Sequence, residues 1–232
     1  DSVLQSLPDH PLYSAIHRVG RRLMEPGLAY APGQEILSSL KHSYDLFELM
    51  VLYRLIAALE AGLGPTWRLA HQARIARLPW EDRPKDGALW AWRGPDGQFL
   101  ELRYQARFHS AKPPPDGRLY SSLSAQGVPD YILVHHRKGE PRSWIILDAK
   151  YRCGRKPIHD ALGDVHRYRD ALRVEGAPAD GAFIIVPSLQ SGAALYGNPA
   201  FVAKHRLGAL VVYDEGWMEP IWRWIRQIDA IS

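Results

Sequence analysis

The chain is short of cysteine and of long apolar runs. It has 232 residues, and Cys153 is its single cysteine, so a disulfide framework within the chain is excluded. The longest apolar patch, residues 46–63, is interrupted by Glu48, Arg54 and Glu60, whereas a membrane span needs about 18 to 20 apolar residues in a row. We also find no secretory signal peptide. These absences favour a reducing compartment, and we expect a cytoplasmic protein with no membrane partner.

Several catalytic signatures are also missing. The sequence holds no G-x-S-x-G elbow, no P-loop and no dinucleotide-binding glycine motif, so a partner must supply any energy from NTP hydrolysis. His159 and His166 lie seven residues apart, but no paired ligand spacing accompanies them or Cys153, which argues against zinc. His135 and His136 are adjacent on a predicted strand, so their rings point to opposite faces and cannot share a metal. We expect both to be solvated at the edge of a sheet.

The composition is that of an ordinary globular protein. Hydrophobic residues make up 46% and charged residues 23%, which excludes a disordered chain. The 29 Lys and Arg against 25 Asp and Glu leave a net charge of +4, which permits a polyanionic partner without requiring one. The length favours one large domain, or one domain with an appendage.

The hydrophobic pattern predicts helices in the first third, strands in the middle and a mixture at the end. Two hairpins are expected, one around Gly94-Pro95-Asp96-Gly97 and one around the polar segment 135–142. The expected order is typical of a mixed sheet with helices on its faces. We expect helices over residues 12–23, 38–63, 158–174 and 221–231, strands over residues 89–92, 99–108, 131–134, 144–147, 182–186 and 209–213, and loops over residues 79–87 and 112–117.

Two aspartates mark the ends of two neighbouring strands. Asp130 opens the apolar strand at 131–134, and Asp148 closes the one at 144–147. Antiparallel pairing would bring both carboxylates to one end of the sheet, and Lys150 would share the face of Asp148 because side chains alternate along a strand. Carboxylates bind Mg²⁺, which promotes phosphodiester hydrolysis, and a nearby ammonium offsets phosphate charge. Such short motifs also arise by chance, but a charged pair that ends an apolar strand has no role in packing.

These residues resemble the signature of a known superfamily. Pro129-Asp130, followed 18 residues later by Asp148-x-Lys150, resembles the signature of the PD-(D/E)XK nucleases. Leu147-Asp-Ala-Lys-Tyr-Arg152 and the helical segment at 166–172 are similar to the McrC-like restriction nucleases and related defence proteins. The segment at 44–49 resembles the Tyr/Phe-Glu-Leu helix of that group. The resemblance runs from about residue 44 to residue 186.

The resemblance implies a fold and a set of roles. It implies a restriction-endonuclease-like α/β (α+β) fold with an αβββαβ core over residues 41–232, preceded by an N-terminal helical element at 1–40. Asp130, Asp148 and the carbonyl of Ala149 would bind the metal, Lys150 would be the catalytic lysine, and Glu48 would complete the site. An isolated glutamate at this position on a helix would more often be solvated, and both interpretations of Glu48 stay open.

The resemblance also implies contacts with nucleic acid. Basic residues gather after the second aspartate, where phosphate contacts would position a duplex without reading its sequence. Asp164 departs from the closest relatives, in which Gln or Lys is expected. Further basic residues, Arg103 and Arg107, lie on the long predicted strand. The candidates for nucleic-acid binding are Arg152, Arg155, Lys156, His166, Tyr168 and Arg169.

The leading hypothesis is a Mg²⁺-dependent DNA endonuclease in which Mn²⁺ can substitute. It would be the effector of a prokaryotic restriction or anti-phage defence system, with an NTP-driven motor, another defence protein or a second copy of the chain as candidate partners. One alternative is a nucleic-acid-binding or assembly module with a vestigial metal site. Another is a nuclease that acts on RNA, although nothing in the sequence indicates recognition of a 2′-hydroxyl.

Overall fold

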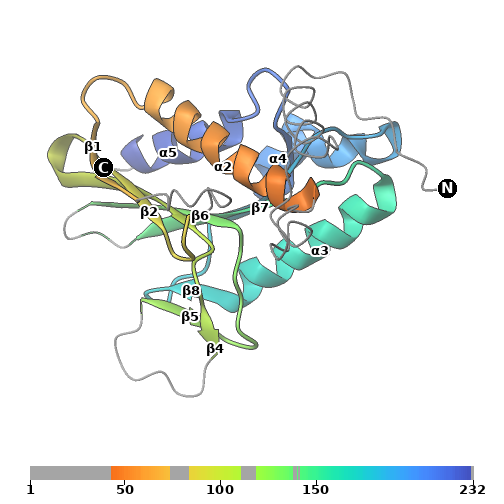
Figure 1. The fold of residues 1–232 in the computed structure, drawn as a ribbon, viewed down its shortest axis with the longest axis horizontal. Coiled ribbons are helices and arrows are strands. Elements are labelled where there is room, and N and C mark those ends of the chain that lie inside the picture. The colour runs from red at the N-terminus through yellow and green to blue at the C-terminus, as the bar shows by residue number, and fades with distance from the viewer. Residues whose placement is uncertain (1–42, 74–83, 111–118, 138–139, 141, 231–232) are drawn as a thin grey trace, which may run out of the picture. The chain divides into compact units, whose positions relative to one another are not determined.

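A computed structural model describes residues 43–73, 84–110, 119–137, 140 and 142–230. Its centre is a seven-stranded mixed sheet with the strand order β1-β2-β3-β6-β7-β9-β10 (Figure 1). The neighbouring strands β1, β2, β3, β6 and β7 pair antiparallel, whereas β7, β9 and β10 run parallel. The strands are β1 (Arg68–Gln72), β2 (Leu89–Arg93), β3 (Gln98–Tyr104), β6 (Tyr131–Arg137), β7 (Ser143–Ala149), β9 (Gly181–Val186) and β10 (Leu207–Val211).

Helices cover both faces of this sheet (Figure 1). A second, three-stranded sheet with the order β4-β5-β8 adjoins the end of α3. No helix in the described ranges combines the length and apolar character needed to cross a membrane. The remaining elements are α2 (Ser43–Gly62), η2 (Pro95–Gly97), β4 (His109–Ser110), β5 (Tyr120–Ser122), α3 (Arg155–Ala171), β8 (Leu172–Val174), η3 (Ser191–Gly197), α4 (Pro199–His205) and α5 (Glu219–Ala230).

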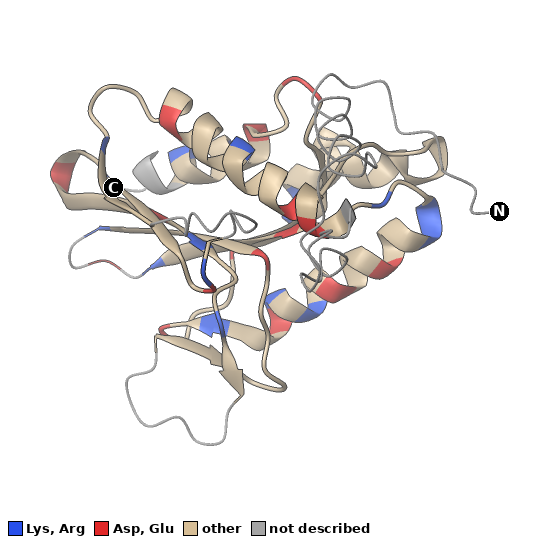
Figure 2. Ribbon diagram, viewed as in Figure 1, with Lys and Arg blue, Asp and Glu red and all other residues tan. Residues whose placement is uncertain are grey.

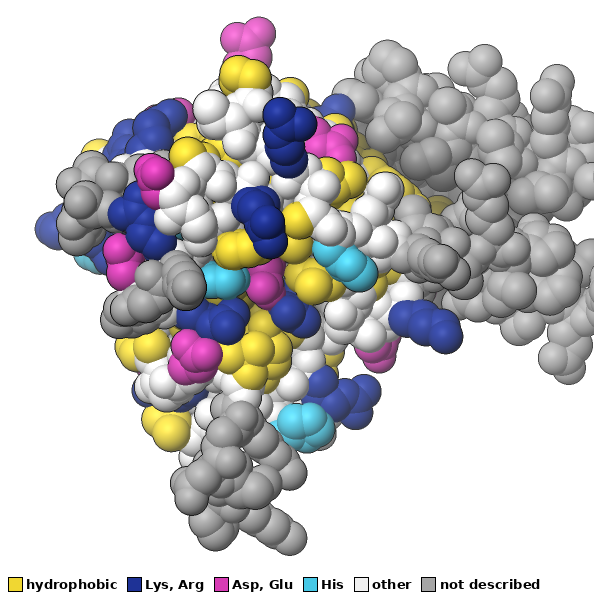
Figure 3. All heavy atoms as spheres, turned by 90° about the vertical axis from the view of Figure 1, so that its left-hand side faces the viewer, with side chains coloured by type: hydrophobic (Ala, Val, Ile, Leu, Met, Phe, Trp, Pro, Cys, Tyr) yellow, Lys and Arg dark blue, Asp and Glu magenta, His cyan; other side chains and the backbone are white. Residues whose placement is uncertain are grey.

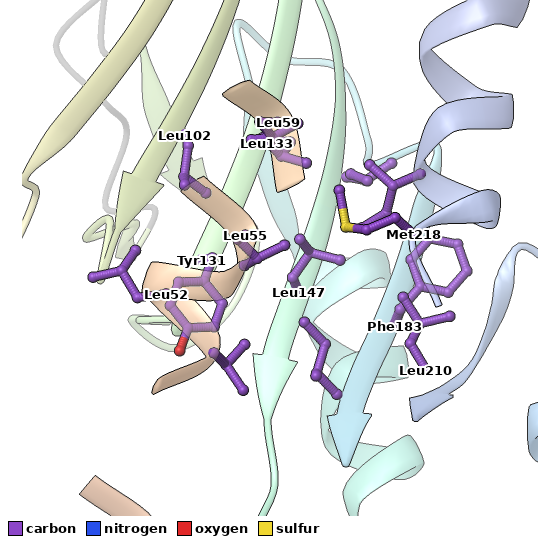
Figure 4. Packing of buried hydrophobic residues seen from close by; sticks show 14 of the residues in the cluster. Leu52, Leu55, Leu59, Leu102, Tyr131, Leu133, Leu147, Phe183, Leu210 and Met218 are labelled. Carbon is purple, nitrogen blue, oxygen red and sulfur yellow. The ribbon is translucent and has the colours of Figure 1, made fainter. Parts of the chain in front are cut away.

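The alternation of side chains along the strands builds one apolar cluster on each face of the sheet. On one face, leucines of α2 pack with Tyr131 and Leu133 of β6 and with Leu147 of β7 (Figure 4). On the other face, α3 packs against Ile132 and Val134 of the same strand β6. The sheet is therefore buried on both sides, which gives the strand ends a rigid support.

The predicted hairpins and the mixed sheet are confirmed. β2 pairs with β3 around the turn at 94–97, and β6 pairs with β7. The helices predicted at 38–63, 158–174 and 221–231 correspond to α2, α3 and α5. The helix predicted at 12–23, the loop predicted at 112–117 and the N-terminal element at 1–40 lie outside the described residues.

Four expectations were wrong in detail. The predicted helix at 158–174 ends at Ala171, because residues 172–174 pair as β8 with β5. The last strand lies at 207–211 rather than 209–213, and the strand at 99–108 stops at Tyr104, because Gln105 takes a left-handed φ of 47°. His135 is not solvated: it is 2% exposed, and its ring lies 6.2 Å from that of Trp67.

Candidate active site

The pairing of β6 with β7 brings the two aspartates to one end of the sheet. Tyr131 is opposite Leu147 in this register, and continuing the register by one residue sets Asp130 opposite Asp148. The side chain of Asp148 is buried, with 2% of the residue exposed, and Asp130 is half-buried. The sheet itself therefore determines how close these carboxylates lie.

Both carboxylates have close partners within the hairpin. The backbone N–H of Ala149 donates to Oδ2 of Asp130 at 2.7 Å. The ammonium Nζ of Lys150 lies 2.6 Å from Oδ2 of Asp148 in an ion pair. The acidic pair and the lysine thus form one compact group at the end of β7.

Burial and neighbouring charges shift the pKa values of Asp130 and Lys150. Burial raises the pKa of Asp130 well above its usual range, and the charges of Asp148 and Glu48 raise it further. Burial alone would lower the pKa of Lys150, but Asp148 and Asp130 outweigh it, so the net pKa of Lys150 is raised. Lys150 is therefore held as an ammonium ion, which can donate a hydrogen bond but cannot accept a proton.

Glu48 reaches this group from α2. It is half-buried, and its Oε1 accepts a hydrogen bond from Nε2 of Gln105 at 2.7 Å. The hydroxyl of Tyr131 donates to the backbone carbonyl of Glu48. Glu48 is therefore not left on a solvated helix face: Gln105 holds its carboxylate, and its charge is among those that raise the pKa of Asp130.

Gln105 is a site residue that sequence reasoning missed. Its backbone N–H donates to the carbonyl of Asp130 at 2.8 Å, while its side chain binds Glu48. One glutamine after a strand carries no pattern that would single it out. The one signal is its place directly after the long strand of the first hairpin, at the sheet end that also holds Asp130.

Tyr168 approaches from α3, on the opposite face from α2. Burial raises the pKa of its half-buried phenol, and the charge of Asp148 raises it further, while Lys150 opposes the shift. The phenol is therefore within electrostatic range of the acidic pair. A side chain at Gly127 would meet Leu172 at 2.8 Å and the ring of Tyr168 at 3.4 Å, so the glycine leaves room for this packing.

The remaining candidates lie on the surface of the segment after β7. Arg152 is exposed, as are Arg155 and Lys156 in the first turn of α3. His166 is exposed and lies 3.8 Å from Asp170. The helix α3 carries acidic and basic residues side by side (Figure 2).

Arg169 is turned elsewhere: its guanidinium donates to the carbonyl of His205 at the end of α4, at 3.0 Å. Arg103 is paired with Glu101 at 2.8 Å, and Arg107 lies 3.8 Å from Asp86. On the face drawn in Figure 3, Lys and Arg side chains likewise lie among Asp and Glu. The positive charge of the described part is thus dispersed among acidic partners.

The donor set fits a hard divalent cation. No three His, Cys, Asp or Glu residues of the described ranges are already arranged as a metal cluster. Mg²⁺ needs fewer, since one or two protein carboxylates together with water and substrate phosphate complete its octahedral shell. Asp130 and Asp148 provide such a pair, and a cation would counteract both the burial and the neighbouring negative charges that raise the pKa of Asp130.

A comparison with protein families gives a match over the middle of the chain. Residues 83–191 match the model of the PD-(D/E)XK nuclease superfamily, and the matched segment contains Asp130, Asp148, Lys150 and Tyr168. This segment of the chain is similar to the PD-(D/E)XK nuclease superfamily. The order α2–β3–β6–β7–α3–β9 corresponds to the αβββαβ core of this superfamily, so the expected restriction-endonuclease-like fold is confirmed. Glu48 lies outside the matched segment.

Comparisons with solved structures and with curated proteins give no further information about the family. The structure of EndoMS in its apo form matches over 68% of this chain and 91% of that chain, at 14% identity and a TM-score of 0.21, and we conclude nothing from so low a TM-score. None of the curated proteins matches this chain. The similarity to the McrC-like group stays a prediction from the motifs.

Proposed function

We propose that this protein is a metal-dependent endonuclease that hydrolyses phosphodiester bonds in DNA. The observation that carries the proposal is the group at the end of β6 and β7, in which Asp130 faces Asp148 and Lys150 lies 2.6 Å from Asp148. Two carboxylates beside an ammonium suit a reaction that needs a cation, a water molecule and a charged phosphate held together.

Asp130 and Asp148 would hold Mg²⁺ or Mn²⁺, with the carbonyl of Ala149 and the carboxylate of Glu48 as further ligands. When bound, the cation polarises the phosphate and favours ionisation of the attacking water. Hydrolysis forms a bond between water oxygen and phosphorus and breaks the bond from phosphorus to one sugar oxygen, which takes a proton as it leaves.

The residues of the chain position the reactants and stabilise charge. Beside Asp148 the raised pKa of Lys150 keeps it an ammonium, which can donate to a phosphate oxygen or orient the water. Tyr168 offers a phenol O–H from the other face of the sheet. Arg155 and Lys156 are exposed in the first turn of α3, where the helix dipole also attracts a phosphate.

The biological setting rests on the motifs. Similarity of the segments at 147–152 and 166–172 to defence nucleases supports a role as effector of a prokaryotic restriction or anti-phage system. A partner with a motor domain, a second copy of the chain or another defence protein would then recruit it to DNA.

Plasmid cleavage tests the proposal. Purified protein is incubated with supercoiled DNA and Mg²⁺ or Mn²⁺, with EDTA as the metal-free reaction. Asp148→Ala and Lys150→Ala should each reduce the cleavage rate by about a hundredfold or more. The exposed Asp160 and Lys204 provide matched controls, and Asp160→Ala and Lys204→Ala should cleave at the wild-type rate.

Cleavage that survives both site substitutions would contradict the assignment. Salt-sensitive DNA binding by a wild-type protein that neither binds Mn²⁺ nor cleaves would favour a binding or assembly module. Parallel digestion of single- and double-stranded DNA and RNA would show whether RNA is the preferred substrate.

A further inference from the structure

Gln105 joins two acidic residues that come from different parts of the chain. Its side-chain Nε2 donates to Oε1 of Glu48 on α2 at 2.7 Å, across a separation of 57 residues. Its backbone N–H donates to the carbonyl of Asp130, just before β6, at 2.8 Å. One residue therefore connects the helix with the end of the sheet at the point where the acidic group assembles.

The backbone of Gln105 is strained where it makes these contacts. Its φ is 47°, a left-handed conformation that glycine adopts readily and glutamine rarely. A residue with a side chain at such a position lowers stability relative to glycine, and it persists where the contacts of that side chain compensate for the strain. Here the left-handed turn ends β3 and directs the amide toward Glu48.

The chemistry of an amide suits this place. A Lys or Arg beside Glu48 would neutralise its charge and compete with any cation for its oxygens. The neutral glutamine amide donates a hydrogen bond to one oxygen of the Glu48 carboxylate and leaves the negative charge of that carboxylate unchanged. The Tyr131 hydroxyl fixes the backbone of Glu48 from the sheet side, so side chain and backbone are held separately.

We propose that Gln105 is a positioning residue that holds the Glu48 carboxylate toward Asp130 and thereby sets the affinity of the acidic group for a divalent cation. This inference rests on the proposed function. Gln105 acts through Glu48 and touches neither cation nor substrate.

Mn²⁺ titration followed by electron paramagnetic resonance tests the proposal without a cleavage readout. Gln105→Leu keeps a side chain of similar size and removes the amide oxygen and nitrogen. It should weaken Mn²⁺ binding by about tenfold, as expected for the loss of a residue that orients a metal ligand. Gln72→Leu on the exposed strand β1 is the matched control and should bind Mn²⁺ like the wild type.

A double-mutant cycle with Glu48→Gln separates positioning from a general structural effect. If Gln105 acts through Glu48, Gln105→Leu should change Mn²⁺ affinity less than twofold in the Glu48→Gln background. An equal loss in both backgrounds would overturn the proposal. Gln105→Gly removes the side chain and relieves the left-handed strain, so it should fold even if Gln105→Leu does not, and it should show the same loss.

The outcomes distinguish this inference from the proposed function. A wild-type protein that binds no Mn²⁺ and cleaves no DNA would overturn both. A wild-type protein that binds Mn²⁺ and cleaves DNA, with Gln105→Leu and Gln105→Gly indistinguishable from it, would overturn the positioning role and leave the nuclease proposal intact.

Discussion

At the scale of single residues, the ion pair of Lys150 with Asp148 matters for stability as well as for chemistry. The side chain of Asp148 is 3% exposed and that of Lys150 24%. Breaking a buried pair by removing one partner leaves an uncompensated charge, which costs far more than the pair itself contributes. We therefore expect the proposed catalytic pair also to contribute to the stability of the fold.

We expect Lys150→Met to lower the free energy of unfolding by about 3 kcal/mol in the presence of EDTA, because the buried Asp148 carboxylate loses the ammonium group that neutralises it. The double variant Asp148→Asn, Lys150→Met should regain most of that loss, since neither charge remains. Urea unfolding measures both values, and Lys204→Met on α4 serves as the surface control. A Lys150→Met protein within about 0.5 kcal/mol of the wild type would show that Asp148 does not depend on this pair.

Tyr120 offers a second residue-scale prediction, with a defined pH dependence. Burial, with Arg103 opposing and Glu101 adding, raises its pKa to about 12, and its hydroxyl finds no hydrogen-bond partner within the described residues. Tyr120→Phe should therefore be neutral or stabilise the protein at pH 7 by up to about 1 kcal/mol. The guanidinium of Arg103, 5.4 Å from the ring centroid, keeps its contact with the phenyl ring.

The pH dependence follows from the direction of the shift. The unfolded chain ionises Tyr120 near pH 10, before the folded state does, so the wild type loses stability as the pH rises from 10 toward 12. The advantage of Tyr120→Phe should grow over this range, as urea unfolding at pH 7, 9 and 10.5 would show. A difference that stays constant with pH would contradict the assignment.

At the scale of elements, two helical glycines have opposite roles. A side chain at Gly62, the last residue of α2, would lie 2.3 Å from the ring of Trp222 on α5. A side chain at Gly163 on α3 would meet nothing within 4 Å. The first glycine lets two helices on one face of the sheet approach each other, and the second has no such function.

We therefore expect alanine to act in opposite directions at the two sites. Gly62→Ala should destabilise the protein by about 1–3 kcal/mol through overpacking. Gly163→Ala should stabilise it by about 0.5–1 kcal/mol, because alanine has the higher helix propensity. Thermal and urea unfolding of the two variants give the comparison, and changes of the same sign would contradict this account of the α2–α5 contact.

The helices and strands also show which structural features local sequence patterns can predict. The β2–β3 and β6–β7 hairpins were predictable because each pairs strands across a short connection, and alternation then decides which side chains share a face. The end of α3 was not predictable, since residues 172–174 become a strand only through pairing with β5, about 50 residues earlier in the chain. Local propensity contains no information about that partner.

At the scale of the whole molecule, cation binding should be linked to stability. A ligand that binds the folded state alone stabilises it by about 2.7 kcal/mol at a concentration one hundred times its dissociation constant. We expect Mg²⁺ or Mn²⁺ to raise the midpoint of thermal unfolding of the wild type accordingly. The variant Asp130→Asn, Asp148→Asn should show no such rise, and an equal rise in both proteins would place the binding elsewhere.

In the candidate site, as in the fold, some groupings of residues follow from the sequence and others depend on tertiary packing. Asp130, Asp148 and Lys150 could be grouped from the sequence alone, because one antiparallel hairpin and the alternation of side chains suffice to bring them together. Glu48, Gln105 and Tyr168 join them only in the folded chain. Their contacts depend on how α2 and α3 pack on opposite faces of the sheet, which long-range burial decides and local periodicity does not.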